Sequence, residues 1–315
     1  MGAPRDHGGG LDAARRRHGG ARADWLDLST GINPEPYPLP DLPPEVWTAL
    51  PDTHAQDALI RAARATWSVP EEIGIIAAPG ASALIARMPA LARGGPIHVP
   101  GPTYNEHAAA LAAAGIPVAD AAPEEGRACI VVHPNNPDGR VWTRADLPRP
   151  GPLTVVDESF CDVDPAASLR LWDRPGAVTL KSFGKFWGLA GLRLGFAIGL
   201  PETLAPLRDG LGPWPVAGPA LAIGTAALSD ADWAAATRTR LHRDAARLDA
   251  LMAPHGRVLG GTPLFRLYEV GDAPAFQARL ASHRIWSRVF PYSRTWLRLG
   301  LPAAAGWDRV AAALA

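Results

Sequence analysis

The chain has 315 residues, of which 47% are hydrophobic and 20% are charged, and its formal net charge at pH 7 is zero. This length exceeds what one small hydrophobic core requires and predicts two domains. A neutral chain offers no basic surface for nucleic acid or for an anionic membrane, so we expect neither as a partner. The composition also excludes intrinsic disorder, which requires low hydrophobicity and high net charge.

Two cysteines, Cys129 and Cys161, stand in the apolar runs RACIVV and ESFCDV. We interpret them as buried free thiols in a reducing compartment, and not as a disulfide framework or a metal site. The N-terminal sequence MGAPRDHGGGLDAARRRHGG lacks the apolar segment of a signal peptide. No apolar run reaches the ~18 residues that cross a bilayer. The sequence therefore predicts a cytoplasmic protein.

Short apolar runs alternate with alanine-rich helical stretches through the middle of the chain. Apolar runs that are continuous rather than alternating are typical of parallel strands covered on both faces. This predicts an α/β fold with a mostly parallel sheet, in a large domain over residues 37–200. The expected strands are 73–77, 96–99, 128–132, 153–157, 177–182 and 193–199, with helices near 81–92 and 104–115.

The sequence changes in character after residue 200. Residues 229–253 contain no glycine or proline and predict a long amphipathic helix with its N-cap at Ser229 or Asp230. Strand-like runs follow, and a helix ends the chain. We therefore predict a smaller α+β domain over residues 201–315, with strands at 263–270, 284–290 and 295–300.

Polar residues follow several of the expected strands, at the edge where open parallel sheets bind ligands. Gly80, Ala81 and Ser82 begin a helix, whose free N–H groups can hold an anion. Asn136 lies in the rigid turn HPNNPDGR. Asp157 ends an apolar strand, where a desolvated carboxylate needs a cationic partner. Taken singly, each feature is also explained by a helix cap or an ordinary loop.

The stretch SFGKFWGLAGLRLGF places Lys185 three residues after Ser182 and eight before Arg193. Apolar surroundings and a nearby guanidinium disfavour the ammonium form, which makes the amine a nucleophile toward an aldehyde. Ser182 and Arg193 suit a phosphate, and Tyr104 at a helix start is either a ring-stacking or an ordinary core tyrosine. An aldehyde, a phosphate, a planar ring and a ring nitrogen for Asp157 together indicate pyridoxal 5'-phosphate.

The order of these motifs resembles the fold-type I pyridoxal-phosphate enzymes of the class I/II aminotransferase superfamily, from about residue 7 to 313. The resemblance implies a homodimer, with a small domain built from both chain ends and an N-terminal arm at residues 1–36. It implies that Lys185 binds the cofactor covalently, that Asp157 pairs with the ring nitrogen and that Asn136 bonds the 3-oxygen. Tyr104 would stack on the ring, and the phosphate would be held by Ala81, Ser82, Ser182 and Arg193.

Two positions depart from the pattern of that superfamily. Phe160, in DESF, stands where many members have a tyrosine that bonds the 3-oxygen, so that bond is expected to be missing. Leu50, in ALPDTHAQ, stands where related aminotransferases often have a tyrosine that reaches the partner's phosphate. The phosphate contact across the dimer is therefore in question.

Motifs near both ends resemble the threonine-phosphate decarboxylase branch, whose members convert L-threonine O-3-phosphate to (R)-1-aminopropan-2-yl phosphate in cobalamin biosynthesis. These motifs are HGGGL at 7–11, LDLSTGINPEPYP at 26–38, IWSRVF at 285–290 and TWLRLGLPAAAGWDRV at 295–310. Two guanidiniums suit a ligand with a carboxylate and a phosphate, but which arginine takes which group stays open. The substrate contacts that the resemblance implies are His7, Gly8, the backbone of Gly31, Asn136, Arg288 and Arg298.

The nearest alternative is a histidinol-phosphate-type aminotransferase, a relative that also handles a phosphorylated amine. Phe160, Leu50 and the HGG start argue against it. The site geometry that selects decarboxylation or transamination cannot be read from the sequence. The choice between threonine phosphate and serine phosphate also stays open, since one methyl group is worth only ~1–3 kcal/mol in a fitted pocket.

Overall fold

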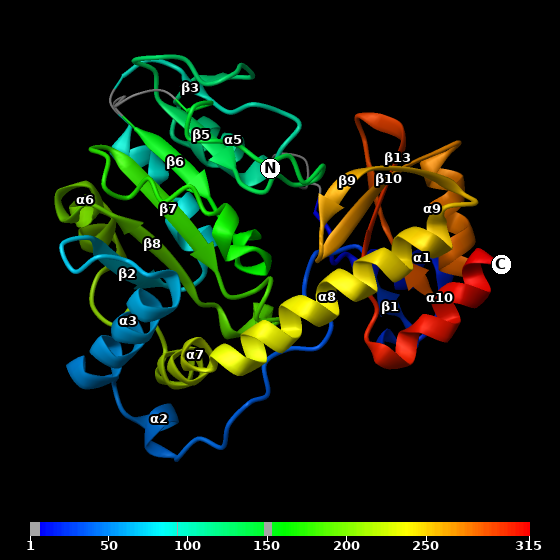
Figure 1. Cartoon of the computed structure of the whole chain (residues 1–315), viewed down its shortest axis with the longest axis horizontal. Coiled ribbons are helices and arrows are strands. Elements are labelled where there is room, and N and C mark those ends of the chain that lie inside the picture. Colours follow the sequence, from blue (N-terminus) through cyan, green and yellow to red (C-terminus); the bar gives the residue numbers. More distant parts are fainter. Residues whose placement is uncertain (1–6, 93, 148–152) are drawn as a thin grey trace. The chain divides into compact units, whose positions relative to one another are not determined.

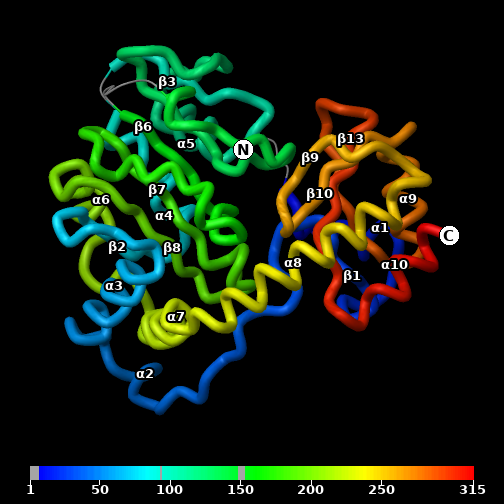
Figure 2. The backbone as a smooth tube through the Cα atoms, in the orientation of Figure 1, coloured from blue at the N-terminus to red at the C-terminus, as the bar shows by residue number. Residues whose placement is uncertain are grey.

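The computed structural model describes residues 7–92, 94–147 and 153–315. Two compact units divide the chain, and each is described by itself (Figures 1 and 2). The larger unit comprises residues 36–136 and 141–236, and the smaller comprises residues 1–35, 137–140 and 237–315. Among the described helices, none combines the length and the hydrophobicity that a membrane span needs.

A seven-stranded sheet forms the centre of the larger unit, in the order β2-β8-β7-β6-β5-β3-β4. The pairs that join β4, β3, β5, β6 and β7 are parallel, whereas β8 runs antiparallel to both of its neighbours. The predicted α/β fold with a mostly parallel sheet is thus confirmed. The strands are β2 (Gly74–Ala78), β3 (Ile97–His98), β4 (Val118–Ala119), β5 (Cys129–Val132), β6 (Thr154–Asp157), β7 (Ala177–Ser182) and β8 (Gly195–Gly199).

Both faces of this sheet are covered, which explains why β5 and β6 are buried along their whole length. On one face, Ile130, Val155 and Val178 from β5, β6 and β7 belong to an apolar cluster with side chains of α4, α5 and α6. Val131 and Val156 belong to a second cluster, with loop residues around Leu169. The helices of this unit are α2 (Glu45–Thr48), α3 (Thr53–Trp67), α4 (Ala81–Ile85), α5 (Asn105–Ala113), α6 (Pro201–Leu211) and α7 (Gly218–Ser229), with short 3-10 helices at Met88–Leu91, Cys161–Val163, Pro165–Ala167 and Ala190–Leu192.

The smaller unit contains a four-stranded antiparallel sheet in the order β12-β13-β10-β9 and a short parallel pair, β1-β11. Its strands are β1 (Leu26–Asp27), β9 (Gly256–Thr262), β10 (Phe265–Val270), β11 (Ile285–Trp286), β12 (Arg288–Phe290) and β13 (Ser293–Gly300). Its helices are α1 (Leu11–His18), α9 (Ala273–Ser282) and α10 (Trp307–Leu314), with 3-10 helices at Arg22–Asp24 and Ala304–Gly306. The pairing of β1 with β11 joins the N-terminal arm to the C-terminal part of the chain.

The boundary predicted at residue 200 differs from the observed one, because residues 201–236 belong to the larger unit. Helix α7 packs on α3 so closely that a Cβ added at Gly224 would lie 2.9 Å from Leu59 Cδ1. The long helix α8 (Ala231–Met252) begins in the larger unit and continues into the smaller one. Its cap is Asp230, whose carboxylate accepts from the N–H of Trp233, while Ser229 closes α7.

The helix predicted at 81–92 is shorter than expected. Helix α4 ends at Ile85, and a 3-10 turn follows at Met88–Leu91. Pro89 lacks the N–H that a continuing α-helix requires, which accounts for the break.

Candidate active site

A cavity of about 100 Å³ lies in the larger unit at the carboxyl ends of the central parallel strands. Val132, Asp157 and Ser182, the last residues of β5, β6 and β7, contribute to its wall. All predicted cofactor-binding residues except Gly80 line this one cavity. The other lining residues are Ala81, Ser82, Ile85, Tyr104, Asn136, Ser159, Phe160, Gly184, Lys185, Ala190 and Arg193.

Asp157 presents a buried anion to the cavity. His107 Nε2 donates to its Oδ2 at 2.8 Å, and the backbone N–H of Ser159 donates to Oδ1 at 3.0 Å. Burial by itself would raise the pKa of Asp157, but the hydrogen bond and the charge of His107, together with Ser159, outweigh it and hold the pKa below its usual value. The carboxylate is therefore ionised at neutral pH and can hold a proton on a ring nitrogen.

His107 was not among the predicted site residues. It lies in the first turn of α5, three residues after Tyr104, and the two rings meet edge to face with their centroids 6.0 Å apart. This spacing of three puts side chains on the same face of a helix. The NEH sequence after Tyr104 was the available signal, but the pairing with Asp157 depends on a contact 50 residues away in the chain.

Gly80 and Arg193 form a positively charged corner beside the cavity. Gly80 precedes α4 with φ of +87°, and a Cβ at this position would lie 2.6 Å from Arg193 Nη2. Only glycine therefore lets the guanidinium approach the start of α4. Arg193 Nη1 donates to the carbonyl of Ala190 at 3.1 Å, which fixes the guanidinium there. With Ser82 and Ser182 in the cavity wall, this corner has the donors that a phosphate requires.

Lys185 lies in the cavity wall with an aromatic ring beside its amine. Its Nζ is 5.3 Å from the centre of the Phe160 ring, and Phe160 is buried. A phenylalanine ring offers no hydroxyl, so the missing tyrosine leaves an apolar surface at this point of the cavity. The lowered pKa expected for Lys185 remains a prediction.

Two arginines are paired in the sheet of the smaller unit. Arg288 on β12 and Arg298 on β13 are partners in the strand register. Burial and the neighbouring charge of Arg288 lower the pKa of Arg298 to about 10, which still leaves its guanidinium charged at neutral pH. Two like charges held side by side repel each other, and an anion bound between them would relieve this repulsion.

The N-terminal arm contacts this arginine pair. Arg298 Nη2 donates to the carbonyl of Ser29 at 2.7 Å, and Arg288 Nη1 donates to the carbonyl of His7 at 3.0 Å. Gly8 lies so close to Ser29 that a Cβ on it would be 2.3 Å from that carbonyl oxygen. Gly31 is buried two residues further along the same segment. The smaller unit thus contains five of the predicted substrate residues, whereas Asn136 lies in the cavity of the larger one.

The comparisons with known proteins cover nearly the whole chain. The family model for aminotransferase class I and II matches residues 24–314. The threonine-phosphate decarboxylase of a Sinorhizobium species is 43% identical and covers 100% of this chain and 99% of its own length. That of Pseudomonas aeruginosa is 40% identical and covers 98% and 97%. A histidinol-phosphate aminotransferase from Symbiobacterium thermophilum is 37% identical, but covers only 50% of this chain and 46% of its own.

Solved structures of aminotransferases have the same fold as this chain. A histidinol-phosphate aminotransferase from Sinorhizobium meliloti, determined in complex with pyridoxal-5'-phosphate, superposes with a TM-score of 0.78. The superposition covers 96% of this chain and 93% of that one, at 20% sequence identity, so it supports the fold alone. Together with the family match over residues 24–314, these findings show that the chain belongs to the class I and II aminotransferase family.

Proposed function

We propose that this protein is a pyridoxal-phosphate-dependent decarboxylase of L-threonine O-3-phosphate, which forms (R)-1-aminopropan-2-yl phosphate for cobalamin biosynthesis. One observation carries the proposal: two relatives that match along 99% and 97% of their own length are threonine-phosphate decarboxylases, whereas a histidinol-phosphate aminotransferase matches along 46% of its own. A cytoplasmic location fits the two free, buried cysteines.

The residues of the cavity fit pyridoxal phosphate. Arg193 and the start of α4 supply the donors for its phosphate, and the ionised Asp157 suits a protonated ring nitrogen. Lys185 lines the same cavity and provides the amine for the aldehyde. When bound, the cofactor supplies an electron sink for the bond that breaks at Cα of the substrate.

With the cofactor bound, each side chain of the cavity would have its own role. Asp157, held ionised by His107 and Ser159, keeps a proton on the ring nitrogen. Tyr104 and Asn136 line the same cavity, where Tyr104 would stack on the ring and Asn136 would donate to its 3-oxygen. Lys185, once its amine is released, returns a proton to Cα as the general acid.

Arg288 and Arg298 are the proposed substrate-binding pair. Their charges suit a ligand that carries both a carboxylate and a phosphate dianion, and Arg298 is fixed by its bond to the Ser29 carbonyl. The carbonyl of His7 accepts from Arg288, and Gly8 lies against the Ser29 carbonyl that accepts from Arg298. Binding both anionic groups would fix rotation about the bond between the substrate's nitrogen and Cα, and this rotation decides which bond at Cα breaks.

The deciding experiment incubates the purified protein, loaded with pyridoxal phosphate, with threonine phosphate, serine phosphate or histidinol phosphate. Carbon dioxide release and an aminopropyl phosphate product from threonine phosphate, without a keto acid, are expected. Exchange of the amine with 2-oxoglutarate, and no carbon dioxide, would instead support the histidinol-phosphate-type aminotransferase. The ratio of kcat/KM for threonine phosphate and serine phosphate identifies the preferred amino acid.

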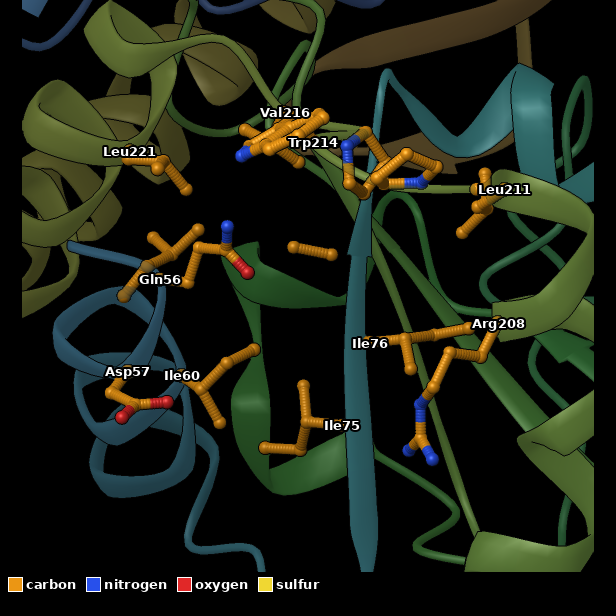
Figure 3. Close-up of a pocket in the computed structure, with 15 residues that line it drawn as sticks. Gln56, Asp57, Ile60, Ile75, Ile76, Arg208, Leu211, Trp214, Val216 and Leu221 are labelled. Atoms are coloured by element: carbon orange, nitrogen blue, oxygen red, sulfur yellow. The ribbon is translucent and has the colours of Figure 1, made fainter. Parts of the chain in front are cut away.

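A homodimer is also proposed, on the evidence of exposed apolar side chains in the larger unit. Trp47, Leu50 and Trp214 are 67%, 68% and 52% exposed. Trp214 stands over a cavity of about 360 Å³ between α3, β2 and the loop before α7 (Figure 3). Leu50 lines a second cavity of about 370 Å³, and both cavities share Leu221. Apolar surface of this kind marks protein interfaces.

Light scattering during gel filtration tests the dimer. The native protein is expected to elute at twice the chain mass, and the double variant Leu50→Glu with Trp214→Glu as a monomer, because a charge placed in an apolar interface costs several kcal/mol. Val141→Glu, at another exposed apolar residue, is the control and should leave the mass unchanged. A native monomer at micromolar concentration would contradict the proposal.

A further inference from the structure

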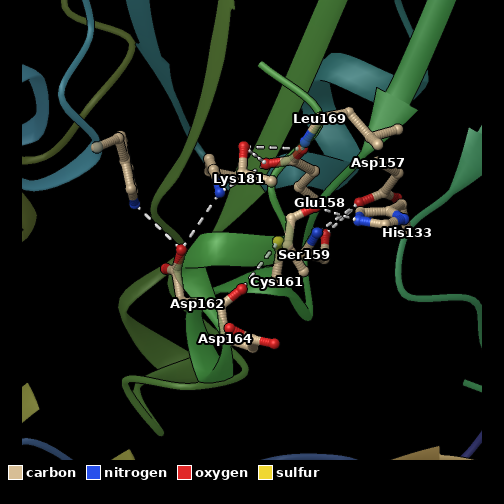
Figure 4. Close-up of polar contacts among 12 residues, drawn as sticks. His133, Asp157, Glu158, Ser159, Cys161, Asp162, Asp164, Leu169 and Lys181 are labelled. Carbon is tan, nitrogen blue, oxygen red and sulfur yellow. Dashed lines mark hydrogen bonds and ion pairs between the residues drawn. The ribbon is translucent and has the colours of Figure 1, made fainter. Parts of the chain in front are cut away.

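Lys181, Glu158 and Asp162 form a buried cluster of charges (Figure 4), in which Glu158 and Lys181 are chain neighbours of the cavity residues Asp157 and Ser182. Lys181 Nζ is 2.8 Å from Glu158 Oε2 and 3.4 Å from Asp162 Oδ1, and the three side chains are at most 5% exposed. Burial by itself would lower the pKa of Lys181, but the two carboxylates outweigh it and raise that pKa. The lysine is therefore held as an ammonium ion and is no nucleophile.

Asp162 ties this cluster to the segment that carries Lys185. Its Oδ2 accepts from Trp187 Nε1 at 3.1 Å, and its Oδ1 accepts from Trp67 Nε1 at 3.1 Å as well as from Lys181. Trp187 follows Lys185 by two residues and is 1% exposed. Its ring is stacked on those of Phe183 and Trp233, with centroids 5.1 and 5.5 Å apart.

The cluster and the cavity share the same two chain segments. At the end of β6 and in the loop that follows it, Asp157 and Phe160 line the cavity, whereas Glu158 and Asp162 belong to the cluster. At the end of β7 and in the loop that follows it, Ser182 and Lys185 line the cavity, whereas Lys181 belongs to the cluster and Trp187 donates to it. In each segment, residues of the cluster or bound to it thus stand close in the chain to residues that line the cavity.

We propose that Asp162 and Trp187 are positioning residues, whose hydrogen bond fixes the direction of the Lys185 amine. Stability alone is a weak reason for such a cluster, because apolar residues of similar volume often stabilise a core as well as a buried ion pair does. A misplacement of ~1 Å at a reacting group lowers the rate about 10²-fold. A hydrogen bond that fixes the segment carrying Lys185 therefore has a large effect on the rate. The inference rests on the role proposed above for Lys185.

The chain offers a matched pair of variants for the test. Trp187→Phe and Trp67→Phe each remove one indole N–H donor to the same carboxylate, but only Trp187 lies on the Lys185 segment. Asp162→Asn is a third variant of unchanged size. Lys181 and Trp67 both donate to Oδ1, so the amide is expected to keep its oxygen there and to turn its NH₂ toward Trp187, which breaks that bond selectively.

The first measurement uses the apoprotein and needs no activity. Lys181 and Lys185 are the only lysines of the chain, so acetylation by acetic anhydride, followed by mass spectrometry, reports on each of them separately. We expect the labelling rate of Lys185 to change at least about threefold in Trp187→Phe and Asp162→Asn, and to stay near the native value in Trp67→Phe. Labelling of the buried Lys181 should stay low in all three variants, since it reports on unfolding.

The second measurement uses the protein loaded with pyridoxal phosphate. The circular dichroism of its visible band is expected to weaken in Trp187→Phe and Asp162→Asn but not in Trp67→Phe. On threonine phosphate, kcat should fall about 10- to 100-fold in the first two variants with little change in KM. If Trp187→Phe does not fold, the comparison of Asp162→Asn with Trp67→Phe still tests whether the hydrogen bond between Asp162 and Trp187 positions Lys185.

Equal effects of Trp67→Phe and Trp187→Phe on Lys185 labelling and on the visible band would overturn the proposal. A rise in Lys181 labelling in parallel with that of Lys185 would also overturn it, since it would show that the variants unfold. A failure of the proposed function gives a different result. In that case the native protein releases no carbon dioxide, while the labelling difference between the two tryptophan variants persists.

Discussion

His107 and Asp157 form a buried pair, in which Nε2 of the imidazole donates to Oδ2 of the carboxylate at 2.8 Å and both side chains are at most 3% exposed. The pair joins α5 to the end of β6. Because the hydrogen bond keeps the carboxylate ionised in spite of its burial, it controls the charge that faces the cavity. The histidine thus acts through the aspartate.

Replacing His107 with phenylalanine is expected to raise the pKa of Asp157 and to weaken cofactor binding. Loss of a hydrogen bond to a buried charged group costs about 1.5–3 kcal/mol, which corresponds to roughly a 10- to 100-fold higher dissociation constant for pyridoxal phosphate. His107→Gln, which keeps an N–H donor, is the control and should retain most of the affinity. Fluorescence titration of the apoprotein measures both variants. Equal affinity of the phenylalanine variant and the native protein would contradict this role.

The same pair gives a pH dependence with a defined sign. The pKa of Asp157 is lower in the folded protein than in the unfolded chain, so its contribution to stability is present above the unfolded value near 3.8 and is lost as the pH falls through the folded pKa. In His107→Phe the effect of burial is opposed less, so this loss of stability in acid is expected to be smaller than in the native protein. Urea unfolding between pH 3 and pH 6 compares the two proteins.

Lys185→Ala is expected to abolish turnover and the visible absorption of the bound cofactor. The variant loses both the amine for the aldehyde and the general acid, and the acid alone contributes about 10²- to 10⁴-fold. Borohydride reduction of the native protein should attach the cofactor to the peptide at Lys185. Attachment at Lys181, the other lysine of the chain, would refute the assignment.

Phe160→Tyr tests the missing hydroxyl. The ring of Phe160 lies 5.3 Å from Lys185 Nζ, so a tyrosine there would bring a hydroxyl close to the bound cofactor. A hydrogen bond to the anionic 3-oxygen favours the form in which the lysine–cofactor adduct has lost its proton. We expect the pKa of the adduct, measured from its visible spectrum, to fall by about one unit. An unchanged pKa would show that the hydroxyl does not reach the 3-oxygen.

Most residues of the cavity wall could be predicted because they follow strands whose apolar runs are plain in the sequence. The carboxyl ends of parallel strands meet at one edge, so Asp157, Ser182 and Lys185 had to lie close together. His107 and Asp162 could not be found in this way, since their roles depend on hydrogen bonds to partners 50 and 25 residues away. The domain boundary was missed for a similar reason, because the packing of α7 on α3 leaves no mark in the local sequence.

Removal of one arginine at a time tests the substrate pair. Arg288→Met and Arg298→Met are each expected to raise KM for threonine phosphate by about 30-fold or more, since loss of one partner of a charged hydrogen-bonded pair costs ~2–5 kcal/mol. Cofactor affinity should not change, because neither residue is a predicted cofactor ligand. Inhibition by inorganic phosphate identifies the arginine that binds the phosphate group, as its variant should lose this inhibition. Unchanged KM in both variants would refute the substrate role of the pair.

The lowered pKa of His133 makes the stability of the fold depend on pH near neutrality. Its Nε2–H donates to the Ala167 carbonyl at 2.8 Å, and its Nδ1 accepts from the N–H of Trp142 at 3.1 Å, so the folded protein holds the ring neutral. Burial lowers the pKa of His133 below its ordinary 6.5, and the hydrogen bond to Ala167 opposes this only in part. The unfolded chain therefore binds a proton at a higher pH than the folded protein does.

Stability should accordingly be full above pH 6.5 and should fall as the pH decreases below it, with a slope of up to about 1.4 kcal/mol per pH unit from this residue. His133→Gln is expected to be less stable at pH 7.5, because two buried hydrogen bonds are disturbed, yet to lose less stability between pH 6.5 and pH 5.5. His54→Gln, at an exposed position, is the control and should keep the native slope. Urea unfolding at the three pH values measures all of these slopes, and an unchanged slope in His133→Gln would assign the acid sensitivity to other groups.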